Sequence, residues 1–108
     1  MAPGAVAWSY LEPVRGREQG GRRPVVVVAT QAYLDVVDAL AIVVPVTRTD
    51  RGWPNHPVLT GVEGLEQCFA MTEQPRTLSR ERLGPVIGVV SPECLQEIRL
   101  WLGEFIVA

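Results

Sequence analysis

The chain has 108 residues, the size of one ordinary domain, and 47% of them are hydrophobic, enough for a core without disulfides or a structural metal. Its net charge of −2 argues by itself against nucleic-acid binding. All ten basic residues are arginines, however, and nine of them lie within residues 15–23, 48–51 and 76–82. A mildly acidic protein can therefore present one basic face, because the local field matters more than the total charge.

The first half of the chain predicts three strands. Residues 4–11 read as a strand, and a polar loop rich in glycine and arginine covers 12–23. Residues 24–29 and 39–47 are apolar without alternation, which indicates strands buried on both faces. Residues 30–38 between them fit either an irregular connection or one turn of helix.

Shorter elements are predicted in the second half. Residues 48–56 form a loop punctuated by glycine and proline. Strands are expected at 57–60 and 66–74, a short strand and a turn at 76–84, and another strand at 85–90. Many short strands in succession favour a small barrel or a strongly curved sheet.

A terminal helix is predicted to begin after Ser91. Ser91 suits the N-cap, Pro92 the first helical position and Glu93 the first turn. One apolar stripe follows, formed by Leu95, Ile98, Leu102 and Phe105. The expected fold is therefore a β-dominated α+β domain, a small SH3-like β-barrel with a C-terminal α-helix, that spans residues 1–108 as a single unit.

The cysteines and the N-terminus bear on location. Cys68 and Cys94 lie in apolar stretches and are expected to be buried free thiols. The first eight residues, MAPGAVAW, lack the basic start and long apolar core of a secretory signal peptide. No run reaches the ~18 apolar residues of a membrane span. We therefore predict a cytoplasmic protein that does not bind the membrane.

No catalytic set is evident from spacing alone. His56 is the single histidine and is expected to be an ordinary loop residue, and the two cysteines lack metal-ligand spacing, so neither a metal nor a cofactor is predicted. Glycine-rich nucleotide motifs and the GxSxG serine motif are absent from the sequence. Arginine, carboxylate, threonine and glycine instead gather at the ends of the buried strands, a combination that suits phosphoryl chemistry without a metal.

Four segments resemble the MazF/PemK family of toxin endoribonucleases. They are REQGGRRPVVVV (17–28), VVPVTRTDRGWP (43–54), EQPRTLSRERL (73–83) and GPVIGVVSPECLQEI (84–98). The similarity extends from Gly4 to about Ile106. It implies an SH3-like barrel, a homodimer, and sequence-specific cleavage of single-stranded RNA. It also implies a cognate antitoxin whose acidic, disordered tail occupies the RNA groove.

The resemblance also implies catalytic residues. Arg23 falls on the catalytic arginine of the family, and Thr47 on the threonine that partners it. Glu18 and Glu73 are the candidates for proton transfer. Met71 stands where the PemK branch has a second catalytic arginine, so we favour Arg23 and Thr47 over a pair on the 71–73 segment.

A basic loop would cover the RNA and present further contacts. Trp53 fits equally a base-stacking platform or barrel packing, while Arg80 and Arg82 are expected to be solvated. The predicted RNA-binding residues are Arg15, Arg17, Gln19, Gly20, Gly21, Arg22, Arg48, Arg51, Trp53, Gln74 and Arg76.

Two further expectations concern partners and chemistry. The apolar stretches 68–71 and 101–108 predict a homodimer interface. Cleavage would proceed by attack of the 2′-hydroxyl of the RNA on the neighbouring phosphorus, without a metal. The alternative is a non-catalytic barrel toxin similar to CcdB, which grips a protein target such as gyrase through its C-terminal helix.

Overall fold

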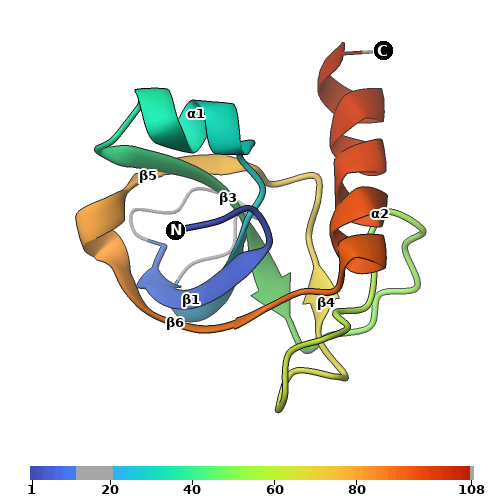
Figure 1. Ribbon diagram of the computed structural model, residues 1–108. Helices are drawn as coiled ribbons and strands as arrows, with labels where there is room; N and C mark the ends of the chain where they lie inside the picture. The colour runs from blue at the N-terminus through green and yellow to red at the C-terminus, as the bar shows by residue number, and fades with distance from the viewer. Residues whose placement is uncertain (12–20, 108) are drawn as a thin grey trace.

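The computed structural model describes residues 1–11 and 21–107. Figure 1 shows a curved sheet with a short helix, α1 (Gln31–Val36), beside β3 and β5, and a longer helix, α2 (Pro92–Leu102), near β4. A 3-10 turn at Arg80–Arg82 joins two strands, and a π-helical turn at Gly103–Val107 continues α2. The strands are β1 (Ala5–Tyr10), β2 (Arg22–Val27), β3 (Leu40–Thr47), β4 (Phe69–Ala70), β5 (Arg76–Ser79) and β6 (Leu83–Val89).

The six strands form one antiparallel sheet. Five of them follow the order β4-β3-β2-β1-β6, and β5 pairs with β3 on the same edge as β4. β4 pairs with the end of β3 and β5 with its beginning, so residues 69–79 run along β3 with an interruption at 71–75. The β-dominated α+β prediction with a C-terminal helix is confirmed. In the described part of the chain, hydrogen bonds do not close the sheet into a complete barrel.

Each face of the sheet has its own core. Val26 belongs to the cluster that includes Ile98 of α2, whereas Val25 and Val27 belong to the cluster that includes Leu34 of α1. Successive residues of a strand point to opposite faces, so a strand covered on both faces must be apolar throughout. This confirms the interpretation of the unbroken apolar runs in β2 and β3.

The ambiguous segment 30–38 contains the helix α1. The Thr30 hydroxyl caps it by accepting a hydrogen bond from the amide of Tyr33. At the other end, the Arg80 guanidinium donates hydrogen bonds to three backbone carbonyls, those of Leu34, Val37 and Leu40. The prediction that Arg80 is solvated is therefore wrong, because the carbonyls left over at the end of α1 need donors.

Helix α2 begins as predicted, with Ser91 accepting a hydrogen bond from the amide of Cys94 and Pro92 in the first turn. The predicted apolar stripe holds as far as Leu102, which packs on the core. Its last member, Phe105, lies beyond α2 and is 50% exposed. The stripe is therefore one residue shorter than predicted.

Three predictions about the middle of the chain need correction. Residues 57–60 form a single bridge, between Val58 and Phe69, rather than a strand. The strand expected at 66–74 is reduced to the two residues of β4. Residues 68–71, predicted to supply an interface, lie largely in the core of the single chain, so they cannot serve as an exposed apolar surface.

Cys68 and Cys94 are both free and buried, as predicted. Burial raises the pKa of the Cys94 thiol, whose sulfur lies 3.6 Å from the carbonyl oxygen of Val58. Among the described residues, no helix is both long and apolar enough to span a bilayer. The cytoplasmic location stays a prediction.

Candidate functional site

A pocket of about 340 Å³ opens where β2 begins and β3 ends. Val25 lies opposite Pro45 in the register of these strands, and continuing it by two residues places Arg23 opposite Thr47. Antiparallel pairing thus brings together two residues 24 positions apart in the sequence. We call this the arginine pocket; its lining is Trp8, Arg22, Arg23, Pro24, Val46, Thr47, Arg48, Thr49, Arg51, Leu65 and Cys68.

Four arginines give the pocket its charge. Arg22 and Arg23 come from β2, and Arg48 and Arg51 from the loop that follows β3. Among the described residues of the lining, none carries a carboxylate. Guanidinium groups gathered in this way create a positive local potential and offer paired N–H donors that match phosphate oxygens.

One aromatic residue of the pocket lining, Trp8, was not among the candidates predicted from the sequence. The guanidinium carbon of Arg22 lies 4.7 Å from the ring centre of Trp8, within the range of a cation–π contact. Trp8 occurs in β1, and register pairs it with Pro24 of β2. The apolar reading of residues 4–11 indicated the strand but not that its tryptophan would support an arginine.

Of the two principal catalytic candidates, Arg23 is held differently from the sequence-based expectation, and Thr47 lies where it was predicted. Arg23 was placed just ahead of a strand, but it is partly buried inside β2, where it pairs with Ser9 of β1. Thr47 ends β3 as predicted and is 3% exposed. Its hydroxyl oxygen accepts a hydrogen bond of 3.1 Å from the amide of Thr49. The hydroxyl therefore stabilises the turn after β3 and retains its own proton for donation.

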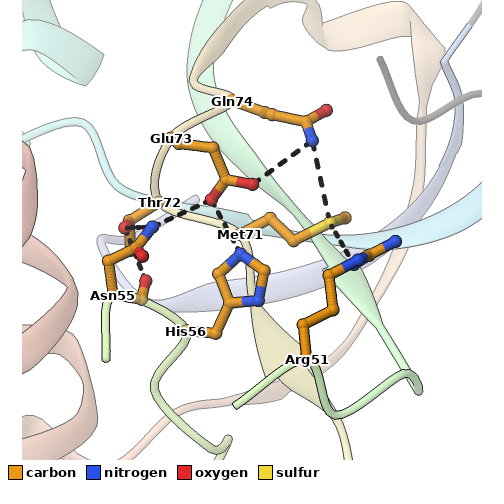
Figure 2. Close-up of polar contacts among 7 residues, drawn as sticks. All are labelled: Arg51, Asn55, His56, Met71, Thr72, Glu73 and Gln74. Atoms are coloured by element: carbon orange, nitrogen blue, oxygen red, sulfur yellow. Dashed lines mark hydrogen bonds and ion pairs between the residues drawn. The ribbon is translucent and has the colours of Figure 1, made fainter. Parts of the chain in front are cut away.

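Glu73 lies in the interruption between β4 and β5, and among the described residues it does not line the arginine pocket. Figure 2 shows its carboxylate within a polar cluster. One oxygen accepts from Asn55 Nδ2 at 3.0 Å and lies 2.8 Å from His56 Nε2. The other accepts from Gln74 Nε2 at 3.4 Å. His56 is a loop residue, as predicted, but it is buried and paired with an acid, which the sequence did not indicate.

Arg51 and Trp53 connect this cluster to the pocket. Arg51 Nη1 lies 3.7 Å from the sulfur of buried Met71 (Figure 2), and its guanidinium carbon lies 6.0 Å from the ring centre of Trp53. The rings of Trp53 and His56 are 4.8 Å apart. Trp53 nevertheless stays 46% exposed, so one part of it packs and the rest remains accessible.

The remaining candidates belong to the segment between β1 and β2 or contact the residues that flank it. Leu11 and Gly21 flank residues 12–20 and are joined by a backbone hydrogen bond of 2.9 Å. Arg76 Nη1 donates to the carbonyl of Leu11 at 3.3 Å, so it binds the backbone just after the end of β1. Gly21 has φ +72°, which favours glycine. The candidates Arg15, Arg17, Glu18, Gln19 and Gly20 lie outside the described residues.

Within residues 1–11 and 21–107, no three histidine, cysteine, aspartate or glutamate side chains come together in a way that could hold a metal ion.

Known proteins resemble the chain over nearly its whole length. Residues 2–106 match the family of PemK-like, MazF-like toxins of type II toxin-antitoxin systems. The endoribonuclease toxin MazF of Escherichia coli (strain K12) is 33% identical over 97 residues, which cover 89% of this chain and 85% of that protein. The crystal structure of MazF from Deinococcus radiodurans has a TM-score of 0.86 at 29% identity and covers 100% of this chain and 97% of its own. A MazE-MazF complex from the same organism has a TM-score of 0.74 at 31% identity, covering 98% and 95%.

Proposed function

Because the chain belongs to the PemK-like, MazF-like toxins of type II toxin-antitoxin systems, we propose that it is an endoribonuclease that cuts single-stranded RNA at the arginine pocket. The four motifs identified in the sequence lie within the matched region. The observation that carries the proposal is the gathering of Arg22, Arg23, Arg48 and Arg51 around Thr47 at one end of the sheet. A protein that only gripped another protein would not need this phosphate-binding set.

The proposed reaction uses the nucleophile that RNA already contains. The 2′-oxygen forms a bond to the adjacent phosphorus while the bond from phosphorus to the 5′-oxygen breaks, and tethering supplies much of the rate. One proton leaves the 2′-hydroxyl and another reaches the 5′-oxygen. Arg23 stabilises the charge that grows on the phosphate oxygens, and the Thr47 hydroxyl orients the phosphate or the 2′-oxygen. Glu18 stays the candidate for proton transfer, since Glu73 lies outside the pocket lining.

The partners follow from the same surface. We propose that a cognate antitoxin places an acidic, disordered segment in the arginine pocket and so excludes RNA. Such binding should weaken as salt rises, because ions replace carboxylate or phosphate contacts. Competition can be measured with a labelled acidic peptide and a labelled RNA, and undiminished simultaneous binding of both would contradict a shared site.

We also propose a homodimer, which would lengthen a short groove by joining two copies. The support is a set of exposed apolar side chains on β6 and near the C-terminus: Val86, Ile87, Val89, Leu100, Phe105, Ile106 and Val107. Sedimentation at micromolar concentration measures this directly, and a monomeric mass would contradict it.

One experiment tests the activity and its chemistry together. Purified protein is incubated with a long single-stranded RNA in the presence of a chelator, and the cut sites and end groups are mapped. We expect discrete fragments with 2′,3′-cyclic phosphate and 5′-hydroxyl ends, and no cut where the attacking nucleotide is 2′-deoxy. Arg23→Ala should lose about 2–4 kcal/mol of transition-state stabilisation with the fold intact. Cleavage at a 2′-deoxy site would refute this mechanism, and intact RNA would favour the CcdB-like alternative.

A further inference from the structure

We propose that Glu73 and His56 are positioning residues, which lock the loop of residues 48–56 onto the 71–75 segment and thereby hold Arg51 at the arginine pocket. The inference rests on the proposed function, because it assigns Arg51 a contact with the RNA phosphate. It gives Glu73 a different role from the proton transfer expected from the sequence.

The end of the loop is tied down by side chains of consecutive residues. The Glu73 carboxylate is hydrogen-bonded to two consecutive residues of the loop, Asn55 at 3.0 Å and His56 at 2.8 Å. The Thr72 hydroxyl donates to the backbone carbonyl of Asn55 at 2.6 Å and accepts from its side-chain amide at 3.3 Å. These contacts, drawn in Figure 2, join segments 17 or 18 residues apart in the chain. They anchor the loop where it returns to the core.

From this anchor, packing extends toward the pocket. The His56 ring packs on Trp53, and its backbone amide donates to the Trp53 carbonyl at 3.1 Å. Arg51 lies between the face of Trp53 and the sulfur of Met71. A thioether is only a weak acceptor, so Met71 orients the guanidinium without neutralising it. Arg51 therefore reaches the pocket with its charge preserved, and its direction depends on Trp53 and His56.

The hydrogen bonds of Glu73 also disfavour a role in proton transfer. A carboxylate can only accept, so the proton between the two groups is on His56 Nε2. Both carboxylate oxygens accept from side chains, one from Asn55 and His56 and the other from Gln74. His56 Nδ1 is buried and, among the described residues, has no hydrogen-bond partner, so the polar contact of the ring with the described residues is the one that Nε2 makes with Glu73.

A double-mutant cycle on RNA cleavage tests the coupling. Arg51→Ala should lower kcat/KM about 10- to 100-fold, the range expected for a lost charged hydrogen bond. Glu73→Ala should lower kcat/KM by a similar factor when it is made in the wild-type protein. Made in the Arg51→Ala protein, it should lower kcat/KM by less than about threefold, since the effects of coupled residues are not additive. The matched control is Glu97→Ala, which removes an exposed carboxylate on α2 and should leave cleavage unchanged. Multiplicative effects of Arg51→Ala and Glu73→Ala would overturn the proposal.

Glu73→Gln separates positioning from proton transfer. The glutamine carbonyl can still accept from Asn55 and His56, and the amide of Gln74 can turn to present its oxygen. We expect this variant to stay within about threefold of wild-type kcat/KM with an unchanged pH profile. An inactive Glu73→Gln protein, or one that loses a limb of the pH profile, would show that Glu73 transfers a proton.

Hydrogen exchange tests the loop without relying on activity. Glu73→Ala should speed amide exchange in residues 48–55 while leaving β1 and β2 protected, and Glu73→Gln and Glu97→Ala should not. Unchanged exchange in the Glu73→Ala protein would overturn the proposal even if the wild type cuts RNA. If the wild type cuts no RNA but the loop loosens, the proposed function fails while the anchoring role stands.

Discussion

Replacing Thr47 with valine separates a structural role of its hydroxyl from a catalytic one. Valine keeps the branched shape but cannot accept the 3.1 Å hydrogen bond from the amide of Thr49. Because Thr49 is exposed, water can satisfy that amide, and the loss in the free energy of unfolding should be about 1 kcal/mol. A domain that starts from about 5 kcal/mol would then be only about 0.1% unfolded. Unfolding therefore cannot lower the measured activity of Thr47→Val noticeably.

Any larger loss in the Thr47→Val protein must come from the reaction itself. If the hydroxyl contacts the phosphate or the 2′-oxygen, kcat/KM should fall about 10- to 100-fold. Thr47→Ser keeps the hydroxyl and should retain most of the activity. The assay is the initial rate of cleavage of a fluorescent RNA, with urea denaturation of the same samples. Wild-type rates in Thr47→Val would refute the catalytic role and leave the hydroxyl as a turn-stabilising group.

Three further predictions concern stability. Arg80→Ala should cost about 2 kcal/mol, because three carbonyls around the end of α1 lose a charged donor; a change under about 0.5 kcal/mol in urea denaturation would contradict this. Gly61→Ala should lower the free energy of unfolding by at least about 1 kcal/mol more than Gly64→Ala. Both glycines have φ near +90°, but only at Gly61 would a Cβ lie 2.7 Å from the amide nitrogen of Ser91. Equal losses in the two variants would exclude this steric reason. The raised pKa of Cys94 means that the folded protein keeps this proton in the alkaline range where the unfolded chain begins to lose it. The free energy of unfolding should therefore fall as pH rises through that region, and it should fall less steeply in the Cys94→Ala protein. Identical slopes in the two proteins would count against burial of the thiol as the cause.

Much of the fold could be predicted from the sequence because its signals are local. The unbroken valine run of β2 indicated burial on both faces, and the structure places a separate core on each face. Ser91 and Pro92 marked the start of α2 correctly, since capping depends on neighbours along the chain. The motifs around Arg23 and Thr47 indicated the family, which the match over residues 2–106 confirms.

Other features depended on contacts between distant segments. The three carbonyls that Arg80 binds lie 40 or more residues away along the chain, so no local pattern distinguishes this arginine from a solvated one. The segment 66–74 has strand-like composition, yet its last residues leave the ladder so that Glu73 can reach His56 and Asn55.

The sequence by itself determined which chemical groups the protein carries: arginines without lysines, a threonine at the end of a buried strand, and one histidine. Tertiary structure alone decided which of them meet. Pairing of β2 with β3 brings Arg23 to Thr47, and folding of the 48–56 loop back onto residues 71–75 encloses His56 against Glu73. The physical reason is that a side chain's role depends on its desolvation and its partners. Both are fixed by strand register and loop path, which residues far apart in the sequence determine together.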